Sequence, residues 1–263
     1  MKDVNILTSN GVNVAASLEL FGDIATYDET VVDFLGGVEE KLSNIKKYKE
    51  NGDMPNYAIL VHSLKSDAKY LGLTSLAEIS YQHEMDSKAN NISAVYNNYD
   101  ALMAEANRSI SILKTYIGDV SPVPTVVAPV VATTIKDKTI LVVDDSDIIR
   151  TFIQKIFNDN YHVMMAHDGK EAIDIIGTSA YENIVGILLD LNMPNIDGFE
   201  VLNYFKENNL FVKIPVSIIT GDDSRETIDR AFTYPITDVL QKPFNERDIK
   251  RIIDKMIAFR NLA

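Results

Sequence analysis

One stretch decides the fold of the second half of the chain: Leu188-Leu189-Asp190-Leu191-Asn192-Met193-Pro194-Asn195-Ile196-Asp197-Gly198. The apolar residues 184–187 precede it, and a continuous apolar run of this length is typical of a strand buried on both faces. Pro194 and the Asp197-Gly198 pair then predict a turn. Asp190 is therefore expected where a buried strand reaches the surface.

Three further segments that are expected to be strands also lead into polar side chains. Residues 139–143 lead into Asp144 and Asp145, residues 216–219 lead into Thr220, and residues 238–241 lead into Lys242. With a strand expected at 162–166, five strands alternate with helices, which predicts an α/β doubly wound parallel sheet. The carboxyl ends of parallel strands share one edge of such a sheet. These four side chains and Asp190 are therefore expected to converge on one site.

The residue types at this edge suit phosphoryl chemistry. Clustered carboxylates without a nearby His or Cys favour Mg²⁺, which prefers oxygen ligands. A lysine and a hydroxyl can donate to the oxygens of a phosphoryl group. One of the carboxylates can act as the nucleophile and form an acyl phosphate.

The order of these motifs resembles the receiver domain of two-component response regulators, with a flavodoxin-like fold, over about residues 138–263. The resemblance implies that Asp190 is the phosphoacceptor and that Thr220 and Lys242 contact the phosphoryl oxygens. It also implies Mg²⁺ as cofactor, with the ligands Asp144, Asp145, Asp190 and the backbone carbonyl of Asn192. The sequence departs from the family at Val239, where an aromatic residue is usual, so the usual coupling between hydroxyl and aromatic is not expected.

The first half of the chain reads as helical. Apolar positions recur at intervals of three and four residues, with Asn, Gly and Pro at the breaks. This pattern predicts an all-α four-helix antiparallel bundle with a shorter helix across one end. The expected helices cover about residues 12–20, 28–49, 55–71, 74–88 and 93–117.

The second long helix of this bundle carries the sequence Val61-His62-Ser63-Leu64-Lys65-Ser66-Asp67-Ala68-Lys69. Helical spacing places His62, Lys65 and Lys69 on one face, and the apolar residues on another. His62 is therefore expected to point outward, with an ordinary imidazole pKa near 6.5 and two lysines that can hold a phosphoryl group.

This motif and the four-helix layout resemble the histidine-phosphotransfer (HPt) domain over roughly residues 11–117. The resemblance implies that His62 is the phosphorylated residue and that Lys65 supports the phosphate. The family more often has glycine where Ser66 stands. His83, His162 and His167 lack such a setting and are interpreted as structural.

Composition sets the remaining bounds. The chain has 263 residues, a formal net charge of −13 and no cysteine, so neither a disulfide nor a thiolate site can form. The acidic balance disfavours nucleic acid and anionic membranes as partners, and the absence of long apolar runs predicts no membrane insertion. A cytoplasmic location is expected. We divide the chain into a bundle at 1–118, a Pro- and Val-rich linker at 119–137, and a receiver domain at 138–263.

Together these features predict a phosphorelay protein that passes phosphoryl groups between His62, Asp190 and partner proteins, which would be a sensor histidine kinase, other receiver domains, or both. The two domains of one chain are also expected to contact each other. We expect no kinase activity, because no glycine-rich nucleotide loop is present.

Two alternatives stay open: a binding module controlled by phosphorylation in which His62 is idle, and a Mg²⁺-dependent phosphohydrolase. The phosphohydrolase is disfavoured because Asn192 stands where its general acid is expected.

Overall fold

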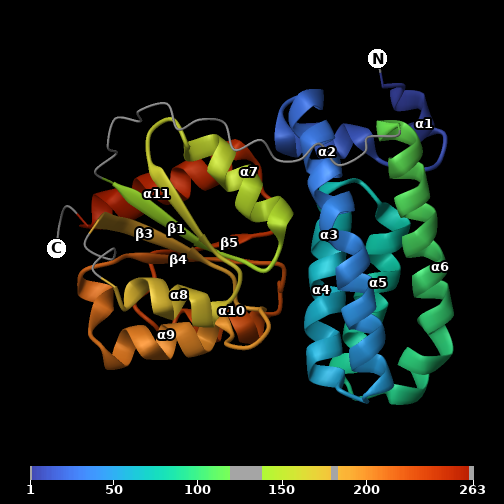
Figure 1. Ribbon diagram of the computed structural model, residues 1–263. Coiled ribbons are helices and arrows are strands. Elements are labelled where there is room, and N and C mark those ends of the chain that lie inside the picture. The colour runs from blue at the N-terminus through green and yellow to red at the C-terminus, as the bar shows by residue number, and fades with distance from the viewer. Residues whose placement is uncertain (1, 119–137, 179–182, 261–263) are drawn as a thin grey trace.

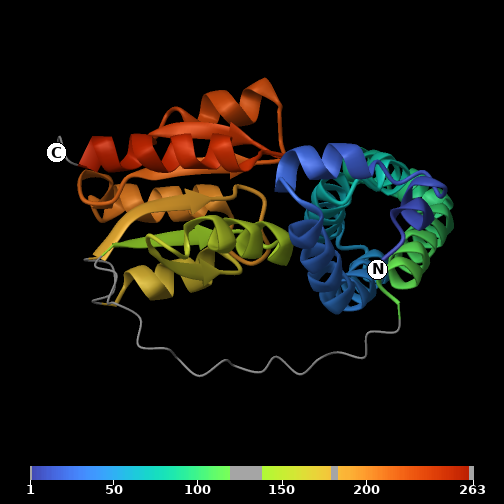
Figure 2. The ribbon, with the colours of Figure 1, turned by 90° about the horizontal axis from the view of Figure 1, so that it is seen from above.

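A computed structural model describes residues 2–118, 138–178 and 183–260. The predicted linker at 119–137 lies outside the described residues. A helical bundle and a layered α/β domain lie side by side, which Figure 1 shows from one side and Figure 2 from above. Within the described helices, none is long and apolar enough to cross a membrane.

The helical half contains the four long helices that the sequence predicts, and two short helices lie across one end (Figure 1). The long helices are α3 (Ile24–Glu50), α4 (Met54–Tyr70), α5 (Thr74–Lys88) and α6 (Ile92–Ile117). The short ones are α1 (Val4–Thr8), which the apolar pattern did not indicate, and α2 (Val14–Phe21). Helix α3 begins four residues earlier than predicted, because the Asp23 carboxylate caps it by accepting from the amide of Thr26.

The second half is a five-stranded parallel sheet in the order β2-β1-β3-β4-β5, which confirms the predicted doubly wound, flavodoxin-like fold. Its strands are β1 (Thr139–Val143), β2 (His162–Ala166), β3 (Ile184–Leu189), β4 (Val216–Thr220) and β5 (Asp238–Gln241). The helices are α7 (Asp147–Phe157), α8 (Gly169–Ile176), α9 (Gly198–Glu207), α10 (Arg225–Ala231) and α11 (Glu246–Arg260), with a short 3-10 turn η2 (Leu210–Val212) before β4.

The helices cover both faces of the sheet. Figure 1 shows α7 and α11 on one face and α8, α9 and α10 on the other. All residues of β1, β3 and β4 are buried, as expected for strands with helices on both sides. The register pairs Val143 with Leu189, so the residues that follow β1 and β3 lie next to each other at the carboxyl edge of the sheet.

The apolar cores of the two halves are continuous. One cluster of buried side chains includes residues of α2, α3 and α4 together with residues of α7, α11 and the sheet. At the junction, Phe21 of the bundle lies edge-on to Phe152 of α7, with the ring centroids 5.1 Å apart. The bundle therefore packs against the receiver half as part of the same folded unit.

Candidate functional site

The acidic residues predicted to converge do meet at the carboxyl edge of the sheet. Asp144 and Asp145 follow β1, and Asp190 follows β3. Each offers one carboxylate oxygen to a group in which all these oxygens lie within 4.8 Å of one another. Asp144 and Asp190 have no exposed surface. Three carboxylates this close repel one another and need a cation among them.

Lys242 supplies one such cation. Its Nζ lies 2.7 Å from Oδ2 of Asp144 and 2.7 Å from Oδ2 of Asp190. Burial raises the pKa of Asp190 to about 7; Lys242 opposes this rise, whereas the two neighbouring aspartates add to it. Burial likewise raises the pKa of Asp145 to about 6. The site is therefore short of positive charge, even with Lys242 in place.

The other oxygen of Asp190 is held by the chain that follows it. Oδ1 accepts from the backbone amides of Leu191, at 2.7 Å, and Asn192, at 3.3 Å. The turn that the Asp197-Gly198 pair predicts packs directly against this segment. A Cβ on Gly198 would lie 2.2 Å from the backbone oxygen of Asp190, so only glycine permits this approach.

Thr220 completes the predicted set. It is fully buried at the end of β4, and its hydroxyl accepts from the amide of Asp222 at 3.1 Å. The donors at this edge are oxygen atoms of carboxylates, which fits Mg²⁺. Asp144, Asp145 and Asp190 are the residues that would hold it. The roles of Thr220 and of the Asn192 carbonyl stay predictions.

The sequence-based expectation that His62 points outward is wrong. The side chain is 2% exposed, because the receiver half covers this face of α4. A Cβ on Gly221, the residue after Thr220, would lie only 2.9 Å from Nε2 of His62. The imidazole therefore faces the receiver edge, one residue beyond a predicted phosphoryl contact.

Glu84 of α5 orients this imidazole. Its Oε1 lies 2.7 Å from Nδ1 of His62 and accepts from Lys88 at 2.7 Å, and its Oε2 accepts from Lys65 at 2.7 Å. Burial alone would raise the pKa of Glu84, but the hydrogen bonds from His62 and Lys65 and the charge of Lys65 hold this pKa well below its ordinary value. An ionised carboxylate can only accept, so Nδ1 carries the proton and the lone pair lies on Nε2.

Within the described residues, Nε2 of His62 is buried and has no hydrogen-bond partner. Burial lowers the pKa of His62 below 6.5, and this effect outweighs the opposing influence of Glu84. The imidazole is therefore neutral at pH 7. A neutral imidazole with a free nitrogen has the protonation state of a nucleophile, and this nitrogen faces the edge where the sequence predicts an acyl phosphate.

The lysines near His62 are arranged differently from the prediction. Lys65 pairs with Glu84 and reaches the backbone oxygen of Gly221 at 3.5 Å, whereas Lys69 is exposed. The cation that the bundle directs toward the acidic edge is Lys41 of α3, which lies next to Asp67 and donates to Ser63 at 2.8 Å. The cation near the acidic edge thus comes from α3, whereas the sequence predicted it on α4.

Sequence reasoning missed Glu84, Gly221 and Lys41. Glu84 did carry a signal, because it recurs at helical spacing with the buried residues Leu76, Ala77 and Ser80, where an acid is unusual. Gly221 carried none, since its importance arises only when the two halves pack together. Lys41 lies on a predicted helix, but nothing local distinguishes it from neighbouring surface lysines.

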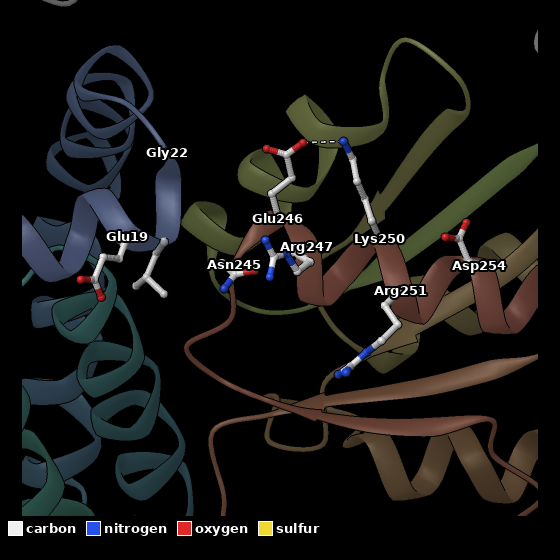
Figure 3. Close-up of a pocket in the computed structure, with 9 residues that line it drawn as sticks. Glu19, Gly22, Asn245, Glu246, Arg247, Lys250, Arg251 and Asp254 are labelled. Carbon is white, nitrogen blue, oxygen red and sulfur yellow. Dashed lines mark hydrogen bonds and ion pairs between the residues drawn. The ribbon is translucent and has the colours of Figure 1, made fainter.

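Two clefts lie near the contact between the halves. One, of about 430 Å³, is lined by His62, Lys88 and Asn192 together with apolar residues at the start of α4. Figure 3 shows the other, of about 660 Å³, between α2 and the start of α11. None of the residues of the predicted phosphoryl site lines this cleft. Its charged lining residues are three acids and three bases: Glu19, Glu246, Asp254, Arg247, Lys250 and Arg251.

The fold and this edge define the second half as a flavodoxin-like α/β domain with a buried acidic site. A family model for the response regulator receiver domain matches residues 140–254. The two-component response regulator ORR3 of Oryza sativa subsp. indica is 31% identical over 119 residues, which are 45% of this chain and 89% of that protein. ARR6 of Arabidopsis thaliana is 29% identical over 133 residues, 47% of this chain and 72% of that protein.

Among solved structures, the receiver domain of the Francisella response regulator 1452 is 31% identical, with a TM-score of 0.41, and covers 48% of this chain and 99% of that one. The chemotaxis protein CheY4 of Vibrio cholerae is 28% identical, with a TM-score of 0.41, and covers 45% and 98%. The chain belongs to the two-component response regulators through the receiver domain in its second half. The resemblance of its first half to HPt domains stays a prediction.

Proposed function

We propose that this protein is a phosphorelay component in which phosphoryl groups pass between Asp190 and His62 of the same chain. One observation carries the proposal: the free Nε2 of a buried, neutral histidine faces the carboxyl edge of a receiver sheet. Histidine kinases or other receiver domains are the partners that would load or unload the pair. Such relays operate in the cytoplasm, which is where we place the protein.

The transfer step balances without a further reactant. Nε2 of His62 attacks phosphorus, the N–P bond forms, and the bond from phosphorus to the carboxylate oxygen of Asp190 breaks. The carboxylate keeps the electron pair, and Lys242, 2.7 Å from Oδ2, stabilises the charge that returns to it. Glu84 stabilises the positive charge that develops on the imidazole, because it accepts from Nδ1. Mg²⁺, when bound, would offset the negative charge of the phosphoryl oxygens.

The test follows the phosphoryl group through single substitutions in the full chain. Acetyl phosphate with Mg²⁺ should label Asp190 first and then His62 in the wild type. The label on His62 should be stable in base and labile in acid, as a phosphoramidate is, and the label on Asp190 should be labile in base. Asp190→Asn should give neither label, and His62→Gln should retain only the acyl phosphate.

The outcomes separate the alternatives. A label that stays on Asp190 in the wild type and never reaches His62 would favour the binding module with an idle histidine. Continuous release of phosphate from many ester substrates, with no lasting label, would favour the phosphohydrolase. Equal labelling of Asp190→Asn and wild type would remove Asp190 from the reaction.

A further inference from the structure

Helix α4 is buried on nearly all sides, although only one of its faces is apolar. The apolar face packs into the bundle through residues such as Val61, Leu64 and Ala68. The opposite face carries a set of polar side chains that a bundle core would not bury, yet each is 1–4% exposed: His62, Ser63, Lys65, Ser66 and Asp67. Because burial of polar groups is costly unless they are paired, the surface that covers them has to be complementary.

The complementarity is visible in the hydrogen bonds across the junction. Asp67 accepts from the Ser146 hydroxyl, at the start of α7, at 2.6 Å. Lys88 lies 3.7 Å from Asp222 in the loop after β4. At the edge of the contact, Glu29 of α3 forms an ion pair with Lys155 of α7. Polar contacts therefore join the two halves both near the centre of the junction and at its rim.

An aromatic cluster fills the space beside these polar contacts. Tyr70, the last residue of α4, packs against Phe152 and Phe244, with centroid distances of 6.4 Å and 5.9 Å. The three rings are 1–3% exposed. The hydroxyl of Tyr70 accepts from the backbone amide of Phe244 at 3.1 Å, and Phe244 follows Lys242 by two residues. Tyr70 therefore bonds to the segment that carries a predicted phosphoryl contact.

We infer that the His62 face of α4 is an interaction surface built for the receiver domain of this same chain, and that Tyr70 helps keep this surface closed to other proteins. The inference rests on the proposed function, since it names the partner of His62. A receiver or kinase from another molecule needs the surface that the internal receiver occupies. Phosphoryl groups therefore pass between this chain and another protein only when the two halves separate.

The test measures access to His62 in the full chain without any phosphoryl transfer. Diethyl pyrocarbonate modifies neutral imidazoles, and mass spectrometry assigns the modification to single histidines. His167 is exposed and serves as the internal reference. In the wild type, His62 should react at least about tenfold more slowly than His167, because only the open form is accessible.

Tyr70→Phe should raise the rate at His62 by about fivefold, the effect expected when one buried hydrogen bond is lost. The matched control is Tyr27→Phe. Tyr27 is also fully buried and donates to the carbonyl of Leu71 at 3.2 Å, but this bond lies inside the bundle. The control should leave the rate at His62 unchanged. Hydrogen exchange at the amide of Phe244 should become faster in Tyr70→Phe and not in the control.

The inference is overturned if wild-type His62 reacts as fast as His167. It is also overturned if Tyr70→Phe and Tyr27→Phe change the rate at His62 equally, because opening would then follow general loss of stability. Failure here is distinct from failure of the proposed function. Carbethoxylation of His62 does not require it to accept a phosphoryl group, and phosphoryl transfer can occur whether or not the surface excludes other proteins.

Discussion

Gly221→Ala should slow transfer between Asp190 and His62 without affecting phosphorylation of Asp190. The added methyl group would lie 2.9 Å from Nε2 and 3.2 Å from Cε1 of His62, whereas ordinary contacts begin at 3.4 Å. The two halves must therefore move apart locally by about 0.5 Å. Because a misplacement of about 1 Å can cost about a hundredfold in rate, transfer should slow by about tenfold.

The φ angle of Gly221 lies outside the left-handed region, so alanine can adopt the same backbone conformation. No backbone strain is added, so the folded state should be preserved. Gly36→Ala is the matched control, because Gly36 lies in α3 and a Cβ there meets nothing within 4 Å. Replacing glycine inside a helix should stabilise the bundle by about 0.5–1 kcal/mol and leave transfer unchanged.

The assay supplies acetyl phosphate and Mg²⁺, quenches samples over time, and measures base-labile and acid-labile phosphate separately. In Gly221→Ala the acyl phosphate on Asp190 should appear at the wild-type rate, and the phosphoramidate on His62 should appear about tenfold later. An unchanged rate at His62 would show that Nε2 does not approach phosphorus past Gly221. An equal loss of both labels would show that the methyl group disturbs the acidic site instead.

Three further predictions concern the same pair. Removal of Mg²⁺ with a chelator should abolish labelling of Asp190, as measured by intact-mass spectrometry, while the fold persists. Glu84→Gln should slow transfer to His62 by about fivefold to tenfold, the difference between a charge-assisted and a neutral hydrogen bond, whereas Glu78→Gln on the exposed side of α5 should not. Burial lowers the pKa of His62, so the neutral imidazole persists to lower pH. The rate of transfer to His62 should therefore fall on the acid side with a midpoint below pH 6.5. A midpoint above pH 6.5 would contradict a neutral His62 at pH 7.

Sequence periodicity predicted the elements well where local physics decides them. The strands β1, β3 and β4 are mostly apolar and fully buried, and α5 begins and ends where its spacing and its breaker residues indicated. The acidic cluster was predictable for the same reason, because parallel strands bring their carboxyl ends to one edge. These inferences need no knowledge of how distant segments pack.

The environment of His62 was not predictable in this way. Helical spacing correctly separated His62 from the apolar face of α4, but it could not show that a second domain covers the polar face. Exposure, the pKa of the imidazole and the contact with Gly221 all depend on that packing. The same holds for Lys41, whose side chain becomes important only because α3 packs against α7.

The chain has a formal net charge of −13, so the two halves pack together only if local charge pairs offset their overall repulsion. At physiological ionic strength, salt screens the repulsion between charges that are more than about 8 Å apart. At the junction the signs alternate, since Lys88 of the bundle meets Asp222 and Lys155 of the receiver meets Glu29. Buried aromatic rings such as Tyr70 provide the attraction, and the charge pairs set the orientation in which His62 faces the acidic edge. High salt should therefore loosen the relative orientation of the two halves more than it weakens the contact between them.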